Sequence, residues 1–188
     1  MPREVEIKIP IDDARAIHAR LAALGALRRG RVLETNRMFD TPERRLVGAD
    51  EGLRLRTTAD LDGGGAHAAT LTFKGPNTGG ALKSREEIET RVADAEALAR
   101  LLERIGFAMT VTYQKRREEW TLLDCVVAID ELPRLGWWIE VEGPDESAVM
   151  RVVEQLGMDA ASGTRANYVE MTARSGERSA DGARVLLF

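Results

Sequence analysis

The chain has 188 residues, of which 44% are hydrophobic and 31% are charged, and its formal net charge is −4. This length suits one well-buried domain, and the composition excludes a disordered protein. The negative net charge argues against a general nucleic-acid binder, and no apolar run is long enough to span a bilayer.

The residues that could carry redox or zinc chemistry are few. Cys125 is the only cysteine, which excludes an intrachain disulfide, and the start of the chain lacks a signal-peptide core, so we expect a cytoplasmic protein. His18 and His67 are the only histidines, which argues against a histidine-based zinc site or a Ser-His-Asp triad. Any metal would then be held by carboxylate oxygen, which favours Mg²⁺ or Mn²⁺.

The first predicted element is a strand over residues 4–9, because polar and apolar residues alternate there. One face carries Glu4, Glu6 and Lys8, and the other carries Val5, Ile7 and Ile9. Two carboxylates and an ammonium group in a row on one face of a strand suit a site that binds a divalent metal together with an anion. An ordinary strand with its polar side in water is the alternative interpretation.

A helix is expected next, capped by Asp12 or Asp13 and ending near Leu24. Residues 31–39 are predicted to be extended, and 40–43 to form a turn.

The middle of the chain predicts three strands and a helix. Strands over 53–57 and 69–74 are joined by a glycine-rich hairpin connection at 62–65. A strand over 83–92 follows, and then a helix over 94–105.

The remaining elements complete an alternating pattern. Residues 110–123 predict two strands or one long bent strand, and 126–132 and 137–142 predict two more. A helix begins at Pro144-Asp145 and ends at Gly157. This order indicates an α+β fold with a mostly antiparallel sheet.

We expect one domain over residues 1–173. The tail, 174–188, is predicted to be mobile, although its apolar end at 185–188 could dock.

Nearly every predicted strand has one apolar face and one charged face. The charged faces carry the bases Lys8, Arg54, Arg56, Lys74, Arg85, Lys115 and Arg117, and the acids Glu4, Glu6, Glu87, Glu89, Asp130, Glu140 and Glu142. If the sheet closes into a barrel with helices over its apolar outside, these faces line the bore. Unpaired ions there would cost several kcal/mol each, so pairing, water and ligands must compensate. A bore lined by these acids and bases suits the binding of a polyphosphate chelated to Mg²⁺. The alternative is an open sheet whose charged face lies in solvent and is stabilised by salt bridges.

Several ordered motifs resemble those of the CYTH domain family, also called triphosphate tunnel metalloenzymes. Glu4-Val5-Glu6-Ile7-Lys8 is similar to the family's ExExK signature. The further matches, in order, are Phe39-Asp40-Thr41-Pro42, Leu53-Arg54-Leu55-Arg56, Leu71-Thr72-Phe73-Lys74-Gly75-Pro76, Ser84-Arg85-Glu86-Glu87-Ile88-Glu89, Lys115-Arg116-Arg117, Ile129-Asp130-Glu131-Leu132-Pro133, Ile139-Glu140-Val141-Glu142-Gly143 and Asn167-Tyr168. The resemblance covers residues 4 to about 172. It implies an eight-stranded antiparallel closed β-barrel, the triphosphate tunnel, with helices packed outside.

The resemblance also implies roles for single residues. Matching metal ligands for Mg²⁺ or Mn²⁺ are Glu4, Glu6, Glu140 and Glu142, with Glu87, Glu89 and Asp130 near a possible second ion. Matching triphosphate-binding bases are Lys8, Arg54, Arg56, Lys74, Lys115 and Arg117, with Arg85 as a further candidate and Arg165 as a weaker match, because Asn167 replaces the usual serine before the tyrosine. Lys74, Lys115 and Asp130 are the expected catalytic groups.

The family's activities leave the reaction open between several choices. Hydrolysis of inorganic or nucleoside triphosphate is the favoured expectation, because residues 36–41 resemble hydrolase-type members. Class IV adenylyl cyclase activity, thiamine triphosphatase activity and a non-enzymatic polyphosphate- or nucleotide-binding module are the alternatives. The expected partner is a small molecule that contains a triphosphate, with no nucleic acid and no membrane. The oligomeric state, monomer or homodimer, is left open.

Overall fold

The computed structural model describes residues 3–65, 67–77, 83–164, 166–179 and 182–188. For residues 3, 4, 83 and 84 it describes the backbone only.

Within the described part, the chain forms strands, α-helices and one 3-10 turn. The strands are β1 (Arg3–Ile11), β2 (Leu27–Asp40), β3 (Gly52–Asp60), β4 (Ala68–Lys74), β5 (Lys83–Arg91), β6 (Ala108–Leu122), β7 (Cys125–Leu132), β8 (Gly136–Gly143), β9 (Glu177–Arg178) and β10 (Arg184–Leu186). The helices are α1 (Ala14–Ala23), α2 (Arg45–Gly48), α3 (Ala95–Arg104), α4 (Glu146–Gln155) and α5 (Tyr168–Ser175), with the 3-10 turn η1 (Ala160–Ser162). The expected α+β class is confirmed, and residues 110–122 of the segment predicted as two strands or one belong to one long strand, β6. Helix α2 and strands β9 and β10 are elements that the sequence did not predict.

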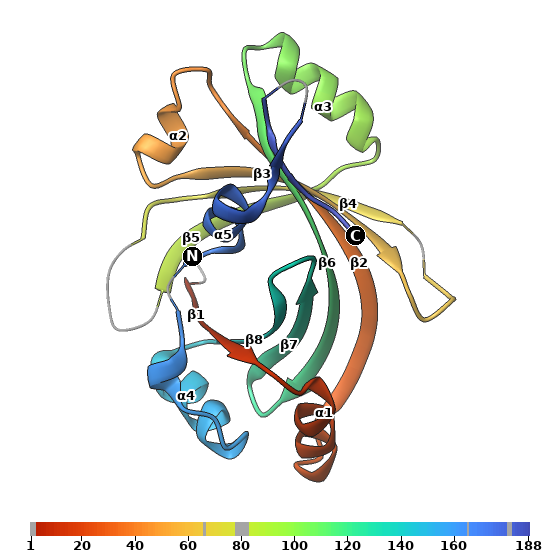
Figure 1. Ribbon diagram of the computed structural model, residues 1–188, viewed down its shortest axis with the longest axis vertical. Coiled ribbons are helices and arrows are strands. Elements are labelled where there is room, and N and C mark those ends of the chain that lie inside the picture. The colour runs from red at the N-terminus through yellow and green to blue at the C-terminus, as the bar shows by residue number, and fades with distance from the viewer. Residues whose placement is uncertain (1–2, 66, 78–82, 165, 180–181) are drawn as a thin grey trace.

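The strands form one strongly curved antiparallel sheet in the order β2-β3-β4-β5-β1-β8-β7-β6, and β6 pairs again with β2. In Figure 1, β2 and β6 form the curved wall between two arms, one of β3, β4 and β5 and the other of β1, β7 and β8.

The arms meet only over a short stretch on the other side. There β1 and β5 pair at four positions, from Arg3 opposite Glu86 to Glu6 opposite Lys83. The two strands are staggered, so residues 87–91 of β5 run past the start of β1, and residues 7–11 of β1 run past Lys83. The sheet is therefore an open half-barrel, and the expectation of an eight-stranded closed barrel is wrong.

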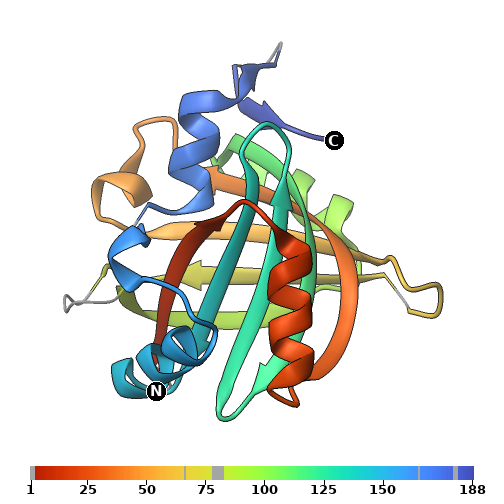
Figure 2. The same cartoon turned by 60° about the horizontal axis from the view of Figure 1, so that its bottom comes forward.

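The apolar faces of the strands turn outward and are covered by helices, as predicted. Helices α1 and α4 pack on the outside of β1, β7 and β8, where Ile9, Leu21 and Val141 are almost fully buried. Figure 2 shows α1 lying across these strands. A second core lies between α3 and the other arm and includes Leu55 and Leu102.

Three of these helices begin at aspartates that cap them. The side chains of Asp13, Asp94 and Asp145 accept hydrogen bonds from backbone N–H groups in the first turn of α1, α3 and α4. Such caps satisfy amide groups that would otherwise lack a partner, which explains why each helix starts there.

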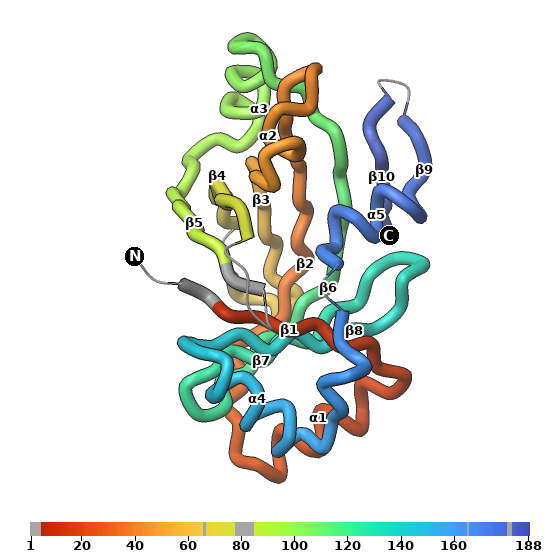
Figure 3. The backbone as a smooth tube through the Cα atoms, turned by 90° about the vertical axis from the view of Figure 1, so that its left-hand side faces the viewer, coloured from red at the N-terminus to blue at the C-terminus, as the bar shows by residue number. Residues whose placement is uncertain are grey.

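The last segments lie against the first half of β6. Strand β10 runs parallel to β6, pairing residues 184–186 with 111–113, whereas β7 pairs with residues 116–122 of the same strand. Leu186 is buried, and the guanidinium of Arg116 lies 4.0 Å from the ring centroid of Phe188. Figure 3 shows α5, β9 and β10 together beside β6. The apolar end of the tail is thus docked, and the mobility of the tail as a whole stays a prediction.

None of the helices in the described residues has both the length and the apolar character needed to cross a membrane.

Candidate functional site

The inward faces of the strands enclose a cavity of about 520 Å³. Among the described residues, eight basic and nine acidic side chains line it. The predicted site residues in this lining are Glu6, Lys8, Arg54, Arg56, Lys74, Arg85, Glu87, Glu89, Lys115, Arg117, Glu140 and Glu142. The charged faces therefore turn inward around one space, as the alternation in the sequence predicts. The side chain of Glu4 and all of Arg165 lie outside the described residues.

Asp130 lies behind the bases of β6 and is not part of the cavity lining. It is fully buried, and Arg117 donates to both of its oxygens over 2.7 Å. Its Oδ2 atom also accepts from Lys115 Nζ at 3.2 Å and from the Tyr168 hydroxyl at 2.9 Å. These contacts describe a carboxylate that holds two bases in place, and its expected roles as a metal ligand and a catalytic group stay predictions.

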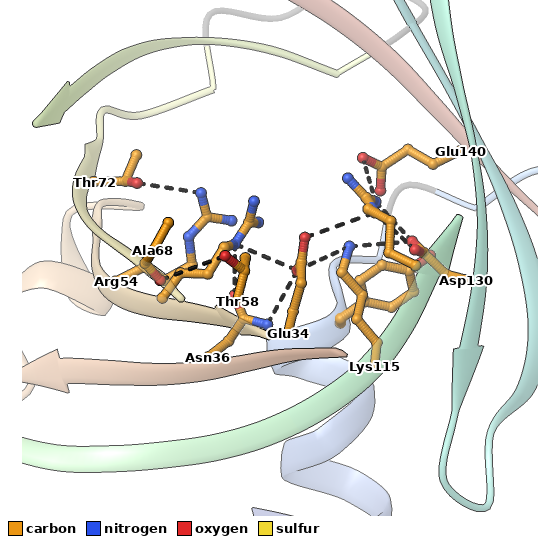
Figure 4. A network of polar contacts seen from close by, with 12 residues as sticks. Glu34, Asn36, Arg54, Thr58, Ala68, Thr72, Lys115, Asp130 and Glu140 are labelled. Carbon is orange, nitrogen blue, oxygen red and sulfur yellow. Dashed lines mark hydrogen bonds and ion pairs between the residues drawn. The ribbon is translucent and has the colours of Figure 1, made fainter. Parts of the chain in front are cut away.

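Glu34 on β2 is a site residue that the sequence did not point to. Its carboxylate lies 3.3 Å from Arg56 Nε, 3.4 Å from Lys115 Nζ and 4.0 Å from Arg117 Nε. Although burial alone would raise its pKa, these cations outweigh burial and hold the pKa of Glu34 well below its usual range. Figure 4 shows Glu34 between Arg54 and Lys115, with Asp130 and Glu140 beyond. The spacing of Glu34 and Asn36, which places both on one face of β2, is a weak signal for it, because Thr35 on the other face is polar as well.

Arg54 and Arg85 line the cavity, and each has a buried donor without a partner among the described residues. Arg54 Nη2 donates to the Thr72 hydroxyl at 3.2 Å, and Arg85 Nη2 lies 3.4 Å from Asp50 Oδ1. Among the described residues, the buried Nε atoms of both arginines have no hydrogen-bond partner. Because an unsatisfied buried donor is costly, these atoms favour the binding of an anion in the cavity.

Lys74 lines the same side of the cavity and pairs with Glu87. Burial, and then the charge of Arg54, lower the pKa of Lys74 to about 8, although Glu87 opposes the shift. The Thr72 hydroxyl donates to Glu89 Oε2 at 2.7 Å, which places Glu89 beside Arg54.

The opposite wall, formed by β1 and β8, carries most of the remaining carboxylates. Glu6 stands directly across from Glu142 in the strand register, and Lys8 stands across from Glu140. Lys8 Nζ lies 2.8 Å from Glu6 and 3.1 Å from Glu140. Burial disfavours the charge on Lys8, but these two carboxylates outweigh it and raise the pKa of Lys8 above its ordinary value.

Glu140 also pairs with Arg117, whose Nη2 atom lies 3.0 Å from its Oε1. Burial alone would raise the pKa of Glu140, but Arg117 and Lys8 outweigh it and lower the pKa well below its usual range.

Part of the cavity wall is apolar. Met38 on β2, Val111 on β6, Val47 on α2 and Val169 on α5 line the cavity, as do Val126 and Ala128 on β7. The cavity could therefore accept an organic substituent as well as charged groups.

The fold and this cavity define a class of protein in which a curled antiparallel sheet surrounds paired acids and bases. The chain matches the model of the CYTH domain over residues 2–168. A protein of Methanocaldococcus jannaschii that is named "Putative adenylate cyclase" is 32% identical over 139 residues, which cover 74% of this chain and 75% of that protein. The chain belongs to the CYTH domain family.

Solved structures agree with this fold. A protein of Pyrococcus horikoshii is 25% identical, with a TM-score of 0.77, over 92% of this chain and 99% of that one. A Hippeastrum protein is 18% identical, with a TM-score of 0.65, over 98% of this chain and 100% of that one. The latter is described as an adenylyl cyclase candidate with a dominant triphosphatase activity.

Proposed function

We propose that this protein is a divalent-metal-dependent hydrolase of triphosphate substrates, either inorganic triphosphate or a nucleoside triphosphate, bound inside the charged cavity. The observation that carries the proposal is the convergence of basic side chains from β1, β3, β4, β5 and β6 on one cavity, two of them with buried, unpartnered Nε atoms. Guanidinium and ammonium groups in such an arrangement suit the oxygens of a phosphate chain.

The charge balance of the cavity supports a requirement for a divalent metal. Its bases are already offset by a similar number of carboxylates. A triphosphate alone would bring several uncompensated negative charges into a buried site, which is costly. A divalent cation that enters with the substrate would offset part of that charge. We therefore expect the metal complex of the triphosphate, and not the free anion, to be the ligand.

The donor set of the β1–β8 wall fits such a cation. Glu6 and Glu142 stand opposite each other in the register, so that one divalent cation could be reached by both carboxylates. Among the described residues no group of three or more acidic, histidine or cysteine side chains is gathered as a ready-made metal site. Mg²⁺ or Mn²⁺ held by one or two carboxylates, with phosphate oxygens and water completing its shell, matches this arrangement.

On this proposal, the side chains that line the cavity have distinct roles. Arg54, Arg56 and Arg85 bind phosphate oxygens, while Lys115 and Arg117, held by Asp130, neutralise charge that develops on the phosphoryl oxygens during the reaction. Lys74 is our candidate for proton transfer. The bound metal would supply Lewis-acid polarisation of the phosphate and orient the attacking water.

Adenylyl cyclase activity is the second candidate, favoured by the name of the relative that is 32% identical. It would need the ribose 3′-oxygen of ATP to reach the α-phosphorus, with the adenine against the apolar side chains of the cavity wall. The triphosphatase activity described for the Hippeastrum protein supports hydrolysis, and that protein shares only the fold with this chain.

Phosphorus NMR of the products distinguishes the candidates. Tripolyphosphate, ATP and thiamine triphosphate are incubated separately with the protein and Mg²⁺ or Mn²⁺, with EDTA as the control. The proposal expects inorganic phosphate from tripolyphosphate or ATP, and no reaction with EDTA. Formation of cAMP and pyrophosphate from ATP, without phosphate, would instead establish the cyclase.

A further inference from the structure

Tyr168 is the first residue of α5 and reaches the cavity wall from outside the sheet. The helix is capped by Asn167, whose Oδ1 atom accepts from the Glu170 amide at 2.8 Å. The side chain of Tyr168 is buried, and Trp138 and Tyr113 each hold its ring at a centroid distance of 6.4 Å. The ring is therefore fixed in place by its neighbours.

The hydroxyl of Tyr168 joins the network behind the bases of β6. It donates to Asp130 Oδ2 at 2.9 Å, and the same oxygen accepts from Lys115 and Arg117. The hydroxyl thus contacts the carboxylate that orients two of the proposed phosphate-binding groups.

The ring of Tyr168 lies close to two ammonium groups that come from different walls of the cavity. Lys8 Nζ on β1 is 5.5 Å from the ring centroid, and Lys115 Nζ on β6 is 5.1 Å from it. An aromatic face attracts a cation at this range, most strongly where water is excluded, and both lysines are buried.

We propose that Tyr168 is a positioning residue that sets the places of Lys8 and Lys115 relative to each other. Without the ring, each ammonium group would be held only by the carboxylates that it already contacts, Glu6 and Glu140 for Lys8, and Glu34 and Asp130 for Lys115. The spacing of two cations across the cavity would then change, and α5 would lose its link to the bases. The inference rests on the proposed function in so far as these lysines bind the phosphate chain.

Kinetics with magnesium tripolyphosphate test this role. Replacing one desolvated cation–aromatic contact has an effect of about tenfold or more, so Tyr168→Leu should raise KM at least about tenfold with a smaller change in kcat. Tyr168→Phe keeps the ring, so its KM should stay within about threefold of the natural protein, because Asp130 retains its other donors. Met171→Ala is the matched control, since Met171 packs α5 against the same core. It should lower the melting temperature without raising KM.

Side-chain NMR of the lysines gives a second readout that needs no substrate. Ring currents should displace the ε-methylene signals of Lys8 and Lys115 in the natural protein and in Tyr168→Phe, and the displacement should vanish in Tyr168→Leu. Undisplaced signals in the natural protein would overturn the proposal even if Tyr168→Leu fails to fold. So would a KM increase in Met171→Ala equal to that in Tyr168→Leu. The proposed function can fail separately. If the lysine signals are displaced but the protein neither binds nor hydrolyses magnesium tripolyphosphate, the proposed function is wrong and the positioning role of Tyr168 is kept.

Discussion

Arg54 and Arg56 follow each other on the inward face of β3, but their surroundings differ. Arg56 Nε donates to Asn36 at 3.0 Å and lies beside Glu34, whereas Arg54 Nε has no partner among the described residues. Arg54 is thus poised to donate to a ligand, while Arg56 is already tied to the wall. On the proposed function, Arg54 would mainly bind the triphosphate, whereas Arg56 would also hold β2 and β3 together.

Substitution of Arg54 should weaken the binding of triphosphate without unfolding the protein. A lost hydrogen bond to a charged group costs about 1.5–3 kcal/mol, so Arg54→Ala should raise KM for magnesium tripolyphosphate about 10- to 100-fold. Arg116→Ala is the control, because Arg116 lies on the outer face of β6 and pairs with Glu131. Steady-state kinetics measure both. Equal KM values for Arg54→Ala and the natural protein would remove Arg54 from the site.

Glu34 makes the stability of the protein depend on pH. Its folded-state pKa is lowered, so its ion pairs stabilise the fold fully above the unfolded pKa of about 4.3, and this stabilisation is lost as the pH falls further. Glu34→Gln should lower the free energy of unfolding at pH 7 by about 3 kcal/mol, because it leaves buried cations without their partner. It should also flatten the fall in stability between about pH 5 and pH 2.

Urea unfolding at a series of pH values measures this effect. Glu103→Gln, an exposed carboxylate on α3, should keep the slope of the natural protein. Identical slopes in Glu34→Gln and the natural protein would show that the cluster around Glu34 contributes nothing to the acid sensitivity.

At the scale of elements, the β1–β8 pair is the proposed metal-binding wall. The double substitution Glu6→Gln with Glu142→Gln keeps the shape of both side chains and removes the charge that would attract the cation. The Mg²⁺ or Mn²⁺ concentration needed for half-maximal activity should rise at least about tenfold. Glu131→Gln, which faces Arg116 on the outer side of β7, serves as the control. Superimposable metal titrations for the double variant and the control would show that these carboxylates are not ligands.

Helix α1 contributes stability at a distance from the site. Leu21 is fully buried between α1 and the outer face of the sheet. Leu21→Ala should lower the free energy of unfolding by about 2–5 kcal/mol, since it removes buried methyl groups and leaves a cavity. KM at a temperature where the variant is folded should not change. A rise in KM would mean that α1 is coupled to the cavity, contrary to this account.

For the whole molecule, alternation along the strands was enough to predict which faces turn inward. Val5, Ile7 and Ile9 were assigned to the outside, and they pack under α1 and α4, whereas Glu6 and Lys8 line the cavity. The helix starts were readable because an aspartate caps a helix through a local hydrogen bond.

What the sequence could not reveal depends on contacts between distant segments. The stagger of β1 against β5 is set by how the two strands meet, which a pattern within either strand does not record. The burial of Asp130 behind Arg117 depends on α5 and its Tyr168, about forty residues further along the chain. The role of Glu34 in the site cannot be predicted from the sequence, because its strand, β2, mixes polar and apolar residues on both faces.

The most direct test is a crystal structure with Mn²⁺ and imidotriphosphate, a slowly hydrolysed triphosphate analogue. Anomalous scattering at the manganese edge locates the metal, and the electron density locates the phosphate chain. We expect the manganese peak between Glu6 and Glu142, and phosphate oxygens within hydrogen-bond distance of Arg54 and Arg85. A ligand bound outside the cavity, with the bases still paired only to their carboxylates, would contradict the account.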